Sequence, residues 1–297
     1  MRRPTTVELM LSTTILLWAL NLSATKYILE HGFQPLSYAT VRYGLAGAVF
    51  VALALATEGS LRIERRHVGT LVVAAVILWL NQLAFVLALD VSAASTVGLL
   101  LGVMPIFAGL FGMLLGREQL TSRFWVAAAV SAAGVALVAV GSGHEVSGGL
   151  EGILLGLAVP ATWAAYSVAV ATLMTTYSAI RVSAVVVPLS WVLIALTGIP
   201  QTSAQDWHVG WEVWALLAFA TLGPLVLTNV LWFRSLGRIG PARATLAVNL
   251  QPFVAALLAV ILLSEPLGAL QILGGALIAA AILGARRRAA PAQAGID

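Results

Sequence analysis

The chain consists of long apolar stretches separated by short polar turns. Each stretch is about 20 residues long, the length that a helix needs to cross the hydrocarbon core of a bilayer. The ten predicted spans are Val7–Ile28, Leu36–Thr57, Val68–Leu89, Ala93–Leu115, Phe124–Val140, Leu150–Met174, Ile180–Ile199, Trp211–Leu236, Pro241–Leu263 and Leu267–Ala285. The pattern predicts an all-α membrane protein with ten transmembrane helices and no soluble domain between spans.

Composition supports this class. Of the 297 residues, 60% are hydrophobic and only 9% are charged, whereas a soluble domain has about 25% charged residues. These fractions exclude an ordinary soluble enzyme and a disordered tail. A nucleic-acid binder is excluded because a net charge of +4 is small. The chain has no cysteine, which excludes disulfides and thiolate metal sites.

The basic residues predict the orientation in the membrane. If the N-terminus is cytoplasmic, 14 of the 16 lysines and arginines fall on the cytoplasmic side, and only Lys26 and Arg42 fall on the other. Positively charged loops resist translocation, so both termini are expected in the cytoplasm.

An internal repeat divides the chain. Pro105 and Pro252 lie 147 residues apart, and Glu118 and Glu265 share that offset. Trp18 and Trp163 pair at a similar offset of 145 residues. We therefore expect two repeats of five spans, residues 1–143 and 144–297. Because five is odd, equivalent helices run in opposite directions, which is the inverted-repeat plan of secondary transporters that work by alternating access.

The repeated residues resemble the EamA-type ten-helix exporters of the drug/metabolite transporter superfamily. Each half has a tryptophan in its first helix, a proline in its fourth and a Glu-x-Leu thirteen residues later, followed by a glycine-containing fifth helix (Gly134; Gly274, Gly275, Gly284). One departure is the first copy, Gly116-Arg117-Glu118, where the family usually has glycine directly before glutamate. The resemblance implies a secondary transporter. Within the family, the chain is most similar to bacterial inner-membrane exporters of aromatic amino acids. Two complete halves in one chain are expected to function as a monomer.

Polar and aromatic residues on several predicted spans suggest a central cavity. Amides can hydrogen-bond the polar end of a neutral amphiphilic ligand, and rings can stack on its apolar body. The alternative is structural, with asparagine and threonine joining helices and tryptophan in interfacial belts. The candidate ligand residues are Trp18, Asn21, Asn81, Gln82, Phe85, Trp163, Tyr166, Thr228, Asn229, Trp232 and Asn249.

Glycine and proline predict bends in the fourth and ninth spans. Proline removes a backbone donor and clashes with the preceding turn, so it bends a helix. The candidate gating or kink residues are Gly98, Gly102, Pro105 and Pro252. Other prolines, among them Pro224, are expected only to shape the bundle.

The few charges near the spans have simple expected roles. Lys26 and Arg42 are expected near the outer end, where they can attract a carboxylate, pair with Glu30 or extend to the lipid headgroups. Glu118 and Glu265 are each expected to cap the helix that follows.

The remaining sequence narrows the functional class. No acidic residue lies mid-span for a proton relay, and no Walker loop is present for direct use of ATP. No metal and no cofactor are expected, and the partners are a small-molecule substrate and the bilayer, not nucleic acid. The leading hypothesis is export of amino acids. The alternatives are efflux of hydrophobic drugs or nucleoside-like metabolites, and, from a different class, a membrane-embedded enzyme or sensor.

Overall fold

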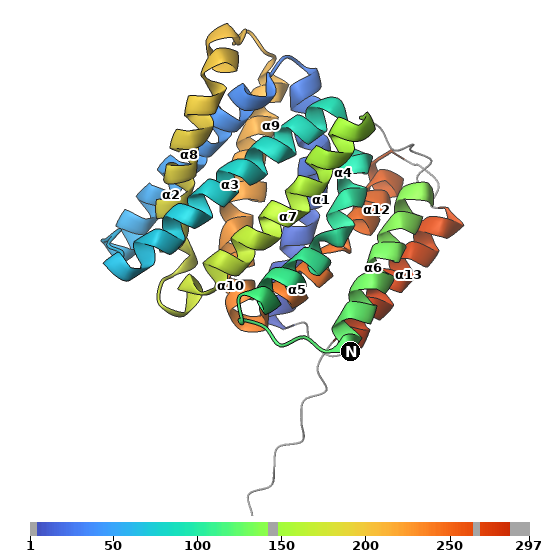
Figure 1. Cartoon of the computed structure of the whole chain (residues 1–297). Helices are drawn as coiled ribbons and strands as arrows, with labels where there is room; N and C mark the ends of the chain where they lie inside the picture. The colour runs from blue at the N-terminus through green and yellow to red at the C-terminus, as the bar shows by residue number, and fades with distance from the viewer. Residues whose placement is uncertain (1–4, 142–147, 264–267, 286–297) are drawn as a thin grey trace, which may run out of the picture.

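A computed structural model describes residues 5–141, 148–263 and 268–285 of the chain (Figure 1). Every regular element in these ranges is helical, and none of them contains a strand. Eight helical segments are long and apolar enough to cross a membrane, and Ala269–Ala285 is a shorter apolar helix. The predicted all-α membrane fold is therefore confirmed.

The first five predicted spans correspond to α1 to α6, and the fourth is interrupted. Its two helical parts are joined by a 3₁₀ turn, Leu101–Val103, which contains Gly102 and ends two residues before Pro105. A regular helix cannot continue unchanged through proline, which lacks an amide hydrogen. The helices are α1 (Thr6–Glu30), α2 (Pro35–Glu58), α3 (Arg65–Val91), α4 (Ala94–Leu100), α5 (Met104–Leu114) and α6 (Ser122–Gly141).

The last five predicted spans correspond to α7 to α13, and two of them are interrupted. The eighth contains a π-helical turn, Leu222–Leu227, around Pro224, a break that the sequence did not predict. The ninth is interrupted at Asn249 and Leu250, just before Pro252. The helices are α7 (Gly149–Ala171), α8 (Ala179–Ala204), α9 (Trp211–Thr221), α10 (Thr228–Ile239), α11 (Pro241–Val248), α12 (Gln251–Leu263) and α13 (Ala269–Ala285).

Local sequence signals fix several helix ends. Thr5 and Glu8 form a capping box at the start of α1: the Thr5 hydroxyl accepts from the Glu8 amide at 3.3 Å, and the Glu8 carboxylate accepts from the Thr5 amide at 2.7 Å. Pro35 is the first residue of α2, where a missing N–H leaves no helical bond unmade. Gly59 ends α2 with φ of 66°, a conformation that favours glycine.

Contacts between the halves follow a pseudo-twofold exchange. α2 packs on α8 and α6 on α13, so each of these helices contacts its equivalent in the other half, and α5 packs on α11, so the equivalent fourth and ninth spans are also in contact. α3 packs on α7, and the exchanged pair, α1 and α10, is also in contact. Equivalent helices run in opposite directions, as α1 and α7 do in Figure 1. The two halves are therefore related as inverted repeats.

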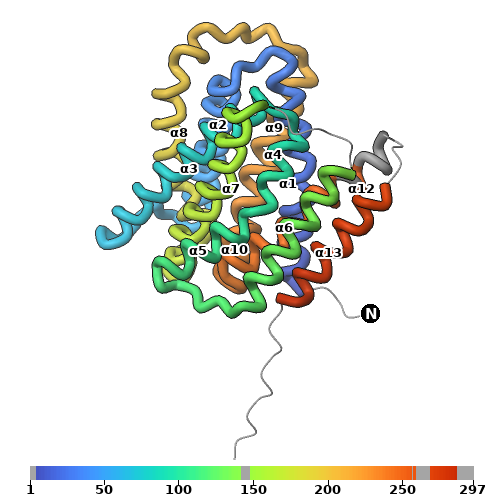
Figure 2. Tube along the Cα trace, turned by 45° about the vertical axis from the view of Figure 1, so that its right-hand side comes forward, coloured from blue at the N-terminus to red at the C-terminus, as the bar shows by residue number. Residues whose placement is uncertain are grey.

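A close helix crossing joins α6 to α13, which lie side by side in Figure 1 and Figure 2. A Cβ atom added to Gly274 would lie 2.4 Å from the backbone oxygen of Gly134, and one added to Gly134 would lie 2.7 Å from the oxygen of Gly274. Small residues let membrane helices approach in this way. Close packing matters in a bilayer because lipid tails leave no hydrophobic driving force between helices. The glycines of the two repeats thus let the backbones of the two halves approach closely.

The outer surface and the two ends of the bundle agree with a membrane setting. Large apolar side chains face outward, as at Leu196 and Leu283, which are 59% and 60% exposed. The start of α1 and the end of α13 lie at the same end of the bundle, together with the turn between α2 and α3, which carries Arg62, and the start of α8, which carries Arg181 (Figure 1). That this end faces the cytoplasm stays a prediction.

Glu118 corrects one prediction. It does not cap the helix that follows it, because its Oε1 accepts a hydrogen bond at 3.2 Å from the backbone N–H of Ala242, in the first turn of α11 of the other half. A carboxylate is favourable at a helix N-terminus. Burial raises the pKa of the Glu118 carboxyl above its usual value, although the Ala242 N–H and the charge of Arg243 lower it. The equivalent prediction for Glu265 lies outside the described residues.

Candidate functional site

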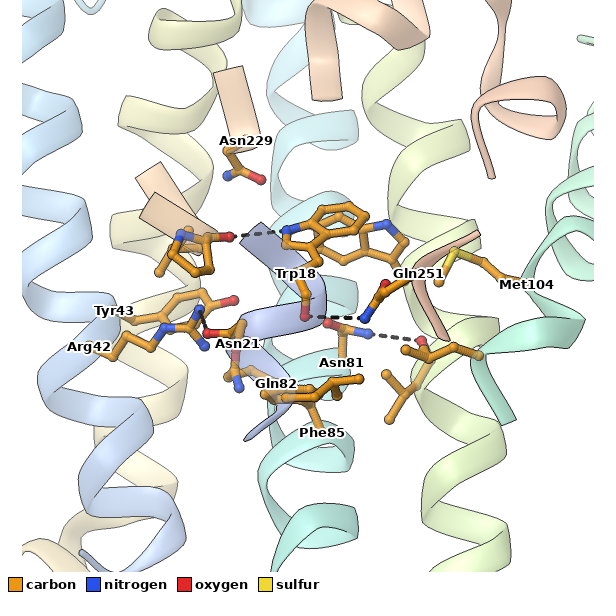
Figure 3. A pocket seen from close by; sticks show the side chains of 16 residues that line it. Trp18, Asn21, Arg42, Tyr43, Asn81, Gln82, Phe85, Met104, Asn229 and Gln251 are labelled. Atoms are coloured by element: carbon orange, nitrogen blue, oxygen red, sulfur yellow. Dashed lines mark hydrogen bonds between the residues drawn. The ribbon is translucent and has the colours of Figure 1, made fainter. Parts of the chain in front are cut away.

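A cavity lies between helices of both halves (Figure 3). The space in it that admits the centres of water-sized molecules is about 100 Å³. The lining residues are Trp18, Asn21, Leu22, Arg42, Tyr43, Asn81, Gln82, Phe85, Leu101, Met104, Val159, Trp163, Pro224, Leu225, Asn229 and Gln251.

Two tryptophans, Trp18 and Trp163, line one wall of the cavity, and a third, Trp232, packs behind that wall. Trp18 and Trp163 are equivalent residues of the two repeats, and their ring centroids lie 5.2 Å apart with nearly perpendicular planes. Trp232 lies behind them, 5.2 Å from Trp18. The Trp18 Nε1 donates to the Pro224 oxygen at 3.1 Å and to the Thr228 hydroxyl at 2.9 Å. The Trp163 Nε1 is buried and has no hydrogen-bond partner among the described residues.

The amides that line the cavity differ in how they are satisfied. Asn81 donates through Nδ2 to the Val159 oxygen at 2.9 Å, and Gln251 donates through Nε2 to the Trp18 oxygen at 3.2 Å. By contrast, Gln82 Nε2 and Asn229 Nδ2 are buried without a hydrogen-bond partner in the part of the chain that the structure describes. Buried donors are normally hydrogen-bonded, so two free amide donors beside a cavity indicate a ligand or water position.

Arg42 is buried at the cavity and not at the end of its helix. It lies seven residues after Pro35, about 10 Å along α2 at 1.5 Å per residue, and only 4% of it is exposed. Its Nη2 donates to the Asn21 Oδ1 at 3.2 Å (Figure 3) and to the Ala220 oxygen at 3.0 Å. The expectation that Arg42 extends to the lipid headgroups or pairs with Glu30 is therefore wrong.

Pro224 explains why a backbone oxygen is available to Arg42. In a regular α-helix the amide of residue 224 would bond to the carbonyl of Ala220, but proline has no amide hydrogen. The Ala220 oxygen instead accepts from both Nε and Nη2 of Arg42, at 3.2 and 3.0 Å. The π-helical turn around Pro224 is thus part of the cavity wall, and π-helical turns are frequent at functional sites.

Seven of the eleven candidate ligand residues line the cavity. They come from α1, α3, α7 and α10, as the expectation of converging polar faces requires, and they are Trp18, Asn21, Asn81, Gln82, Phe85, Trp163 and Asn229.

The structure does not bring the other four to the cavity surface. Trp232 is fully buried and donates to the Ser167 hydroxyl at 3.1 Å, and Thr228 accepts from Trp18 behind the wall. Tyr166 is also fully buried, with its ring 5.8 Å from that of Phe233. Asn249 lies at the break between α11 and α12. These four residues therefore support the wall and do not form its surface.

Sequence reasoning missed Arg42, Tyr43 and Gln251 as lining residues. A charge well inside an apolar span is itself a signal of a site, and the position of Arg42 within its span provided that signal. Gln251 lies two residues beyond the candidate Asn249 on the same predicted span. Tyr43 follows Arg42 directly, and only the packing shows that it borders the cavity.

The interrupted fourth and ninth spans meet at their break points. Asn249 donates through Nδ2 to the backbone oxygen of Gly102 at 2.8 Å and to the Ser131 hydroxyl at 3.0 Å. Gly102 and Asn249 are 147 residues apart, the offset of the repeat, so equivalent break points contact each other near the pseudo-twofold axis. Gly98 lies within α4, where the helix is unbroken.

Of the residues that the structure describes, those that line the cavity include one cation and no acidic side chain. Among the described residues, no group of three His, Asp or Glu side chains is arranged to hold a metal ion. The site can therefore donate hydrogen bonds, stack on rings and attract negative charge.

Comparison with known proteins agrees with this architecture. Residues 5–140 and 150–287 each match the profile of the EamA-like transporter family. Over 263 residues the chain is 25% identical to a Bacillus subtilis (strain 168) protein named "Uncharacterized transporter YyaM", covering 84% of each chain. It is also 25% identical over 263 residues to "Uncharacterized transporter YdeK" of the same organism, covering 86% of this chain and 88% of that protein.

A solved structure shares the fold. A protein described only as "Crystal structure of protein" aligns with a TM-score of 0.76 and 23% sequence identity, over 94% of this chain and 96% of that one. Since both halves match the family profile, the chain belongs to the EamA-like transporter family.

Proposed function

We propose that this transporter exports amino acids, aromatic or other neutral amphiphilic ones, across the bacterial inner membrane as a secondary transporter. One observation carries the proposal: the cavity between the repeats combines tryptophan rings with hydrogen-bond donors that no described protein group uses. An amphiphilic molecule matches both properties, because its apolar body can stack on the rings while its polar end accepts from the donors.

The ring wall favours an aromatic body. Trp18 and Trp163 form a corner with an interplanar angle of 86°, and Phe85 lines the same cavity. A flat ring placed in that corner can stack on one indole and meet the edge of the other, and such pairs are worth about 0.5–1.5 kcal/mol beyond the buried area.

The break points support alternating access. The interrupted fourth and ninth spans cross where Asn249 bonds to Gly102, and inverted repeats of this kind can exchange conformations around a fixed central site. We propose that bending at Gly98, Gly102, Pro105 and Pro252 opens the cavity alternately to the two sides.

The remaining features of the proposal concern arrangement in the cell. We assign residues 1–143 and 144–297 to the two repeats, place both termini in the cytoplasm and take the monomer as the working unit, since both halves are in one chain. Reporter fusions after Arg66 and after Asp297 should behave alike and opposite to a fusion within residues 142–148. Any other pattern would overturn the topology.

Flux in proteoliposomes tests the proposed substrate class. Purified full-length protein should transport labelled phenylalanine or tryptophan faster than empty liposomes do, and unlabelled aromatic amino acids should compete. Trp163→Ala should reduce the flux per folded molecule several-fold, because it removes half of the ring corner. Leu196→Ala, on the lipid-facing surface, is the matched control and should leave flux unchanged.

Two outcomes would contradict the proposal. If the protein transports hydrophobic drugs or nucleosides but none of the aromatic amino acids, the proposed substrate class is wrong. Equal flux by the Trp163→Ala and Leu196→Ala variants would remove the ring corner from the site.

A further inference from the structure

Arg42 is a buried positive charge that has no negative partner among the described residues. None of the acidic residues in the described ranges lies within ion-pair distance of it, and no acidic side chain lines the cavity. An ionised group inside a membrane protein is expensive unless it is paired or faces a water-filled cavity. Arg42 therefore has a role that offsets this cost.

The groups around Arg42 hold the guanidinium in place without neutralising it. Nε and Nη2 donate to the Ala220 oxygen, and Nη2 also donates to Asn21 Oδ1. The Tyr38 ring lies 5.6 Å from the Arg42 Cζ, within cation–π range. All of these partners are uncharged, so the full positive charge remains beside the cavity.

The guanidinium is also fixed in direction. The Ala220 oxygen receives two of its hydrogen bonds, while Nη1 makes none within the described part of the chain. Arginine presents a planar set of donors that matches the two oxygens of a carboxylate. A preorganised guanidinium with a free edge is suited to bind an anion that enters the cavity.

We infer that Arg42 binds the carboxylate of the transported molecule, and that the cavity requires this carboxylate but not an amino group. The inference rests on the proposed function, because it concerns the same cavity and the same aromatic ligands. It also narrows the substrate class. An aromatic monocarboxylate meets a complementary charge, whereas the ammonium group of an amino acid meets neutral oxygens and rings only.

Three ligands that share a phenyl ring and differ in their charged groups test whether the cavity requires the carboxylate, the ammonium group or both. Phenylalanine carries both charged groups, 3-phenylpropionate carries only the carboxylate, and 2-phenylethylamine carries only the ammonium group. Binding to the full-length protein in nanodiscs at pH 7 can be measured by calorimetry. We expect 3-phenylpropionate to bind at least as tightly as phenylalanine, and 2-phenylethylamine to bind about 10-fold or more weakly, as the loss of a hydrogen bond to a charged group implies.

Variants assign this preference to Arg42. Arg42→Gln should reduce the ratio of acid to amine affinity by about 10-fold or more, and Arg42→Lys should retain part of it because the charge remains. Lys26→Gln is the matched control: Lys26 also lies in the first two helices, but it donates to the Leu89 oxygen at 2.8 Å and pairs with Glu30, away from the cavity. The ratio of acid to amine affinity of Lys26→Gln should equal that of the wild type.

The outcomes distinguish this inference from the function on which it rests. Equal binding of acid and amine by the wild type, or an unchanged ratio in Arg42→Gln, would overturn the role of Arg42 and leave aromatic transport standing. The wild-type comparison decides the matter even if Arg42→Gln does not fold. Failure of all three compounds to bind would overturn the proposed function and the inference together.

Discussion

Two buried asparagines mark two regions with opposite designs. Asn249, at the crossing of the interrupted helices, and Asn229, at the cavity, are each only 2% exposed. The Asn249 Nδ2 donates to the Gly102 oxygen and the Ser131 hydroxyl, whereas the Asn229 Nδ2 has no partner among the described residues. The two side chains are equally buried, so the regions differ in whether the buried amide donor has a hydrogen-bond partner.

The difference has a physical reason. At the helix crossing, polar groups must pair with one another, because an unpaired buried donor carries its full desolvation cost. At the cavity, a donor can be left for a ligand or for water that occupies the space. The α6–α13 crossing is a third solution, in which glycines let the two helix backbones approach closely.

The largest effect is expected where two backbones touch. In Gly274→Leu the new side chain would begin 2.4 Å from the Gly134 backbone oxygen, which cannot move aside, and 2.8 Å from the Val138 Cγ2. We expect a loss of about 3 kcal/mol or more of stability, at the upper end for overpacked cores. The melting temperature and the yield of folded protein in detergent measure it.

Gly284→Leu is the control for this substitution. Gly284 lies on the same helix, but no atom lies within 4 Å of a Cβ added there. The melting temperature should stay close to the wild-type value. If both variants melt alike, the close α6–α13 approach does not hold the halves together.

The next effect concerns the satisfied asparagine. Asn249→Ala leaves the Gly102 oxygen and the Ser131 hydroxyl without their donor. Unsatisfied buried groups cost about 1–3 kcal/mol each, so we expect a lower melting temperature. An unchanged melting temperature would show that the contact between the repeat break points is not stabilising, and the comparison with the cavity would fail.

The unsatisfied asparagine should behave in the opposite way. Asn229→Ala removes no hydrogen bond from Nδ2 within the described residues, so stability should fall by less than in Asn249→Ala, which leaves two buried groups without their donor. Binding of an aromatic amino acid should weaken by about 1 kcal/mol, the net value of one hydrogen bond. Calorimetry and thermal melting on one preparation measure both quantities. A variant that loses stability and binds normally would make Asn229 structural.

The smallest effect concerns Glu118, outside the spans. Burial raises the pKa of this carboxyl, so the folded state favours its protonated form, and that stability is lost as pH rises through the raised pKa. Glu118→Gln cannot ionise and can still accept from the Ala242 N–H. Its melting temperature should match the wild type at acid pH and exceed it slightly at pH 7.5. The opposite sign would mean that the ionised carboxylate is preferred at the start of α11.

Much of the fold could be read from the sequence, because the bilayer imposes a simple rule. A helix must be about 20 apolar residues long to cross it, so apolar length and charged ends gave the spans without knowledge of any contact. The repeat offset gave the inverted plan, and proline at positions 105 and 252 gave two of the three interruptions. The break at Pro224 was not predicted, because a proline in a membrane helix can also be accommodated by neighbouring helices.

The sequence by itself therefore determined the membrane class, the spans and most of the polar residues of the cavity. Only the tertiary structure decided which of these residues are already satisfied, since that depends on atoms from other helices. Asn81, Trp232 and Asn249 find partners there, while the side-chain N–H donors of Gln82, Trp163 and Asn229 have none among the residues that the structure describes. The tertiary structure also placed Arg42 at the cavity, because the Ala220 oxygen that holds it lies 178 residues away in the chain. Composition and periodicity carry no information about such long-range pairs.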